Sequence, residues 1–155
     1  MDSLLQLDDL RQISRLAFTE QNLLSNLCKS SYYEFLKVFW DVIVPEKLVD
    51  NWHIQVLCNE FQDVMERVFR GERRKHDLLV NIPPGTSKST VFSVCGSAWA
   101  WSRQPSLKFI CASFAQAVSM DLSRRCRDVV DSDLYRELFP DDKFRLRSDQ
   151  NAEIS

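Results

Sequence analysis

The chain has few glycines, a small net charge and no long apolar run, and each of these shortages excludes a class of protein. Only three of its 155 residues are glycine, so it is neither loop-dominated nor of low complexity. Twenty basic and 22 acidic residues leave a formal net charge of -2, which argues against a general polyanion-binding surface. No apolar run approaches membrane-spanning length, and the N-terminus lacks the layout of a signal peptide. We therefore expect a soluble, cytoplasmic protein without a membrane partner.

Cysteine pairs and metal-ligand spacings are also missing. The five cysteines are odd in number and far apart, none forms a C-x-x-C pair, and His53 and His76 stand at no ligand spacing to them. Cys95 and Cys111 lie in apolar stretches, which predicts small core residues. We expect neither disulfides nor a zinc site, and a reducing compartment.

The first half of the chain has helical periodicity. Apolar residues recur at three-residue steps from Leu7 to Leu16, and a further helix capped by Ser30 or Ser31 is expected to end before Pro45. A third helix is predicted from about Asn51 to Gly71. The positions expected to face the core are Tyr32, Phe35, Leu36, Phe39, Trp40, Ile43, Ile54, Leu57, Phe61, Val64, Met65 and Val68.

The period changes at Asp77. Two short apolar runs, residues 78–82 and 107–112, are typical of parallel strands buried on both faces. Helices are predicted over residues 88–101 and 115–130, and a short one begins after Ser132 and ends before Pro140. The pattern favours an α/β, P-loop NTPase-like fold with a partial parallel sheet flanked by helices. We expect a helical leader over residues 1–76 and a partial ATPase core over residues 77–155.

The turn between the first predicted strand and its helix has the composition of a phosphate-binding loop. In the pattern G-x-x-x-x-G-K-[ST], the lysine reaches phosphates and the hydroxyl binds Mg²⁺, and here Lys88 and Ser89 occupy those positions. Ile82 and Ser87 replace the two glycines, and we expect Ser87 to be tolerated at negative φ. A lysine at a helix N-terminus opposes the helix dipole unless an anion lies between them. The predicted phosphate-binding residues are Pro84, Gly85, Thr86, Ser87, Lys88, Ser89 and Thr90.

Longer motifs extend this pattern to a family. The segments "LLVNIPPGTSKSTVFSVCGSAWAW" and "FICASFAQAVSMDLSRRCRDVVDSDLYRELFP", with "FWDVIVP" and "NWHIQVLCNEF" upstream, resemble the N-terminal ATPase region of the large terminase subunit of tailed bacteriophages. The similarity spans about residues 32–140. Shared positions are Pro83, Pro84, Lys88, Ser89, Trp99, Ala112, Ser113, Phe114, Arg124, Arg127, Ser132, Tyr135, Leu138, Phe139 and Pro140. The family often has an arginine at the position of Gly85, so that arginine's role is absent here.

The resemblance implies a motor that packages double-stranded DNA into procapsids of a phage or prophage. Its cofactors would be ATP and Mg²⁺, and its partners DNA, the portal protein, the small terminase subunit and further copies of itself in a ring. By the same resemblance Trp52, His53 and Gln55 would contact or wall the adenine, although Trp52 in the core is the alternative. Arg124, Arg125 and Arg127 could contact DNA, but a solvated face is favoured, since Asp121 and Asp128 stand at helical spacing to them.

No residue of the chain is a good candidate for the carboxylates that ATP hydrolysis requires. They should follow an apolar strand, and no such run precedes Asp141, Asp142, Asp149 or Glu153. In the family these acids and a nuclease domain lie further downstream. We therefore expect an N-terminal fragment without catalytic residues of its own and without ATP turnover. Two alternatives stay open: a degenerate P-loop that serves only as an interaction scaffold, and a helicase-like ATPase fragment.

Overall fold

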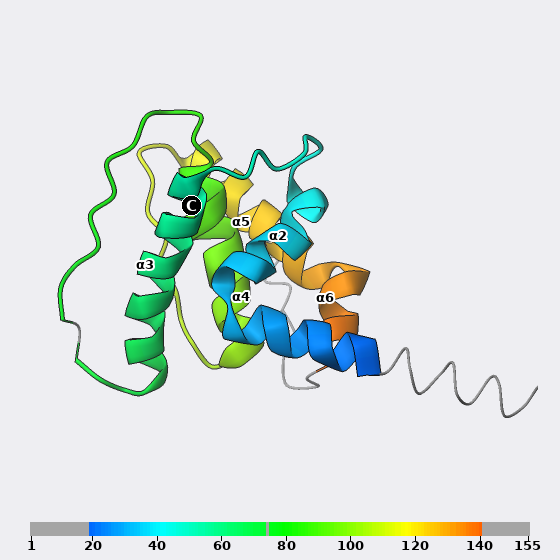
Figure 1. Ribbon diagram of the computed structural model, residues 1–155. Coiled ribbons are helices and arrows are strands. Elements are labelled where there is room, and N and C mark those ends of the chain that lie inside the picture. The colour runs from blue at the N-terminus through cyan, green and yellow to red at the C-terminus, as the bar shows by residue number, and fades with distance from the viewer. Residues whose placement is uncertain (1–18, 74, 141–155) are drawn as a thin grey trace, which may run out of the picture.

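Helices make up all the regular structure in the residues that a computed structural model of the protein describes, 19–73 and 75–140. Helical structure runs through residues 19–30, followed by α2 (Tyr32–Ile43) and α3 (Trp52–Phe69). A π-helical segment, η1 (Thr90–Cys95), continues directly into α4 (Gly96–Arg103), and α5 (Gln116–Asp131) and α6 (Asp133–Leu138) complete the bundle (Figure 1). No helix among these residues combines the length and apolarity needed to cross a lipid bilayer.

Local sequence signals set both ends of α2 and the start of α6. The hydroxyl of Ser31 accepts a hydrogen bond from the Glu34 N–H (3.3 Å), and that of Ser132 accepts one from the Tyr135 N–H (3.2 Å). Each such cap stabilises a helix by about 1 kcal/mol. α2 ends two residues before Pro45, since the residue before a proline disfavours helical backbone. The caps and the proline stop predicted from the sequence are therefore confirmed, while the periodic stretch from Leu7 to Leu16 lies outside the described residues.

The core is aromatic and is centred on Trp99. This side chain is fully buried, its indole N–H donates to the Cys28 carbonyl (2.9 Å), and its ring lies 5.1 Å from the Tyr32 ring. Burying a large apolar side chain contributes about 1.5–3 kcal/mol, so this cluster is a main source of stability. Residues from both sides of the predicted domain boundary at residue 76 contribute to this core. Its fully buried members besides Trp99 include Tyr32, Phe35, Leu36, Phe39, Cys58, Val91, Val94, Cys95 and Val129.

The predicted α/β fold with a partial parallel sheet is wrong, because residues 19–73 and 75–140 contain no strand. The two apolar runs instead have no regular secondary structure and form no strand ladder with one another. Leu78, Val80 and Ile82 are half-buried, whereas Leu79 between them is 93% exposed. In the second run Leu107 and Phe109 pack on the helices, and Ile110 is 98% exposed. A strand requires a partner for its backbone groups, and an apolar run alone does not specify one.

Candidate functional site

The loop from Pro83 to Thr90 reverses the chain into the helix that carries the core tryptophan. Residues 84–85 form a turn, Gly85 has φ +82°, and the Thr86 hydroxyl donates to the Pro83 carbonyl (2.7 Å). Ser87 has φ +59°. The negative φ at which we expected Ser87 to be tolerated in the loop is therefore not observed. The helix begins at Lys88, and the chain enters it through a left-handed residue, which costs a non-glycine residue about 1–2 kcal/mol.

This backbone conformation is one that binds anions. A left-handed residue followed by a helical one turns successive N–H groups toward the same side, as in the concave nests that hold phosphates. The Val91 N–H donates to the Ser87 carbonyl (2.9 Å) and makes the first backbone hydrogen bond of the helix. The N–H groups of residues 88–90 precede that bond and so have no partner within the helix. They point to the region in front of the helix, where the dipole favours negative charge.

The predicted site residues differ in how far they are exposed to solvent. Pro84, Gly85, Lys88 and Ser89 are exposed, so the lysine and the Ser89 hydroxyl are both accessible to a ligand. Thr86 and Ser87 are half-buried. Thr90, by contrast, is 6% exposed and lies in the core side of the first turn, so its side chain does not face the loop's solvent side. Gln55 is exposed on the first turn of α3.

The helix after the loop runs parallel to α3. Phe92 lies 5.7 Å from Phe61 between ring centroids, and Trp99 lies 5.7 Å from Phe69, so the contacts advance along both helices in the same direction. Arg103, one turn after Trp99, pairs with Glu66 on α3. Figure 1 shows α5 beginning at this same end of the bundle. Three helix N-termini therefore lie at the end of the molecule that carries the loop.

That end combines helix N-termini without side-chain caps and exposed aromatic rings. The N-cap residues of α3 and α5, Asn51 and Ala115, make no side-chain capping hydrogen bond, so the positive ends of both dipoles are not neutralised by a cap. Trp52 is 79% exposed and Phe114 is 94% exposed. The alternative in which Trp52 belongs to the core is thus wrong. Exposed rings beside uncapped helix starts are suited to a ligand that has both a flat base and phosphates.

A π-helical segment directly after the loop was missed from the sequence. In η1 the Gly96 N–H donates to the Val91 carbonyl, five residues back, where an α-helix would bond four residues back. The inward residues predicted for this helix, Val91, Val94, Cys95 and Ala98, are all fully buried. Apolar spacing does not distinguish the two helix types here, and the one unusual signal was Gly96 inside an otherwise helical pattern.

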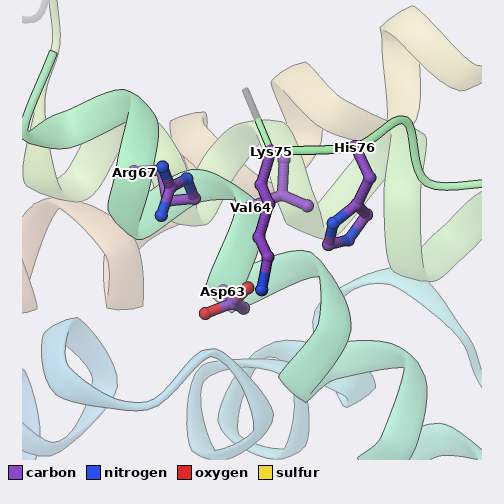
Figure 2. A pocket seen from close by; sticks show the side chains of 5 residues that line it. All are labelled: Asp63, Val64, Arg67, Lys75 and His76. Atoms are coloured by element: carbon purple, nitrogen blue, oxygen red, sulfur yellow. The ribbon is translucent and has the colours of Figure 1, made fainter. Parts of the chain in front are cut away.

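A small, open hollow with an accessible volume of about 10 Å³ lies between α3 and the segment that follows it. Asp63, Val64, Arg67, Lys75 and His76 line it, and Figure 2 shows Lys75 reaching down from the segment toward Asp63 on the helix. Pockets for small molecules enclose about 300–1,000 Å³, so this hollow is too small to enclose a nucleotide.

Two exposed arginines form ion pairs with nearby acids. Arg124 pairs with Asp121 (2.9 Å) and Arg70 with Glu72 (2.7 Å), both at exposed positions. Arg124 therefore lies on a solvated face and is paired with Asp121, as expected from their helical spacing, and contact with DNA stays a separate prediction.

Four of the five cysteines, Cys28, Cys58, Cys95 and Cys126, are buried. Burial, with a smaller effect of the Asp50 charge, raises the pKa of the Cys58 thiol to about 12. Cys111 is exposed, so its predicted core position is wrong: it lies in the run that the helices cover on one face only.

Comparisons with protein families, characterised proteins and solved structures find no match for the chain.

Proposed function

We propose that the chain binds the phosphates of a nucleotide at the loop 83–90. The observation that carries the proposal is the left-handed Ser87 directly before a helix start at Lys88. A left-handed serine is unfavourable by about 1–2 kcal/mol, and such strain persists mostly where the surrounding structure and a function require it. Lys88 at the helix start opposes the dipole, and an anion bound between the two removes that conflict.

ATP with Mg²⁺ is the nucleotide that the residues favour. Lys88 would neutralise the terminal phosphates, and the exposed Ser89 hydroxyl is a suitable oxygen ligand for Mg²⁺. Mg²⁺ keeps several waters and takes the rest of its ligands from one or two protein oxygens and phosphates, so a single hydroxyl is compatible with its chemistry. Gln55 and Trp52 lie on the first turn of α3, at the same end of the bundle, where a base could stack and form hydrogen bonds.

The wider role that we propose follows from the family resemblance. It is that of a large terminase subunit, which uses ATP to package double-stranded DNA and works with a portal protein and a small terminase subunit. Under this proposal the protein acts in the cytoplasm of a bacterial host as a ring of identical subunits. The phosphate loop is supported by its own backbone conformation and does not depend on the sheet that the sequence predicted.

A scaffold function without nucleotide is the second candidate. It is favoured by the exposed apolar side chains of Leu79, Ile110 and Phe114, which are 93%, 98% and 94% exposed. Side chains of this kind are typical of surfaces that contact another protein.

Thermal unfolding with and without Mg–ATP separates the two candidates. A ligand at 100 times its Kd stabilises the folded state by about 2.7 kcal/mol, which is a Tm increase of about 5–10 °C for a chain of this size. We expect this increase to be lost in Lys88→Ala. It should persist in Lys108→Ala, which removes an exposed lysine from another segment. An equal increase in both variants would place nucleotide elsewhere, and no increase in any protein would favour the scaffold.

A further inference from the structure

The carbonyl of Val91 accepts two hydrogen bonds. One comes from the Gly96 N–H within the π-helical segment, and the other comes from the hydroxyl of Tyr32 on α2. A carbonyl oxygen has two lone pairs, so this pairing satisfies it fully. Val91 is itself fully buried, so the second bond is made in a region without competing water.

Tyr32 is held rigidly. It is fully buried, its N–H donates to the Gln62 side-chain oxygen (2.8 Å), and its ring lies 5.2 Å from Phe61 and 5.1 Å from Trp99. Burial raises the pKa of its hydroxyl well above the ordinary range, so the group remains a donor. The hydroxyl therefore stands at a fixed point against which the π-helical segment is positioned.

π-helical turns are rare in proteins and need contacts from outside the helix to persist. Here those contacts are the Tyr32 hydroxyl and the ring of Phe61, which lies against Gly96. A change of the segment to an α-helix would remove one residue from the turn. Residues before it would then rotate about the axis by roughly 100° relative to α4. Lys88 and Ser89 are the residues that would rotate.

We propose that Tyr32 is a positioning residue, whose hydroxyl holds the π-helical segment and thereby sets the register in which Lys88 and Ser89 face the loop. The proposal rests on the proposed phosphate site for its functional consequence, and its structural part stands independently. Two unusual backbone features, left-handed Ser87 and the π-helical segment, are separated by two residues and serve the same two side chains.

The test compares Tyr32→Phe with Tyr135→Phe in the full chain. Tyr135 is a matched control because it is also buried and its hydroxyl donates to the Ala98 carbonyl (2.8 Å), in the α-helical part of the same helix. We expect both variants to lose a similar amount of stability. Only Tyr32→Phe should shift the amide NMR signals of residues 87–96, and it should weaken Mg–ATP binding about tenfold. Equal signal shifts at residues 87–96 in both variants, or none in Tyr32→Phe, would overturn the proposal.

Deletion of the half-buried Ser93 provides a second test that keeps Tyr32. It converts the bond from the Gly96 N–H to the Val91 carbonyl into an ordinary α-helical one, with residues 88–91 and 96–103 both able to stay in place. We expect the signals of residues 87–90 to match the wild type, and a further Tyr32→Phe change to leave them unmoved. If the deletion moves these signals as Tyr32→Phe does, the register proposal is wrong. If wild type binds no Mg–ATP but the NMR results hold, the phosphate site fails and the register role of Tyr32 stands.

Discussion

Replacing Gly96 with alanine has two opposing effects on stability, at the point where the helix after the loop meets α3. Glycine inside a helix is about 1 kcal/mol less favourable than alanine, so propensity alone predicts stabilisation. A Cβ at Gly96, however, would lie 2.8 Å from Cζ and 2.9 Å from Cε1 of Phe61, and 3.1 Å from the Val91 carbonyl oxygen. These distances are too short, so either the ring or the helix must move.

The Phe61 ring has little room to move. It lies 5.2 Å from Tyr32, 5.7 Å from Phe92 and 6.4 Å from Trp99 between ring centroids. Overpacking a core costs about 1–3 kcal/mol, which exceeds the propensity gain. We therefore expect Gly96→Ala to destabilise the protein by a net of about 1 kcal/mol.

Urea unfolding of a double-mutant cycle measures this effect. With Phe61→Leu the clash is relieved, so Gly96→Ala should become neutral or stabilising, with a coupling energy of at least about 1 kcal/mol. Gly71→Ala is the control: Gly71 has φ +66° and nothing within 4 Å of its added Cβ, so its cost should not depend on Phe61. Stabilisation by Gly96→Ala in the wild-type background, or zero coupling to Phe61, would refute the reasoning.

Three further predictions concern the loop and the thiols. Ser87→Gly should raise the free energy of unfolding by about 0.5–1 kcal/mol, because glycine adopts positive φ without strain. Ser87→Val should lower it, because a β-branched residue is poorly accommodated at positive φ. Equal effects of the two variants in urea titrations would contradict the observed φ of +59°. Iodoacetamide should modify Cys111 before Cys58 at pH 8, as peptide mass spectrometry would show; simultaneous labelling would contradict the burial of Cys58. The folded state keeps the Cys58 thiol protonated up to about pH 12, whereas the unfolded chain loses this proton near the ordinary pKa of 9.0. Stability should consequently fall as pH rises above about 9, by up to about 1.4 kcal/mol per pH unit for this thiol, and less steeply in Cys58→Ala.

The helices were accessible from the sequence because their signals are local. Apolar spacing identified the inward faces of α2 and α3, although Val68, which was expected to face the core, is 37% exposed. Ser31 and Ser132 marked two helix starts by their own side-chain hydrogen bonds. The composition of the loop likewise located a reversal with an exposed lysine at a helix start. Each of these features depends on residues within about one helical turn of one another.

Only the tertiary structure decided the rest. Residues 78–82 and 107–112 have the composition of strands, but a strand exists only where another segment supplies hydrogen-bond partners, and the described residues supply none. The positive φ of Ser87 has no signal in the local sequence, and in the π-helical segment the Val91 carbonyl accepts a hydrogen bond from the Tyr32 hydroxyl, far away in the chain on α2. The sequence thus determined where the helices lie and which faces they bury, whereas packing between them determined the backbone geometry of the candidate site.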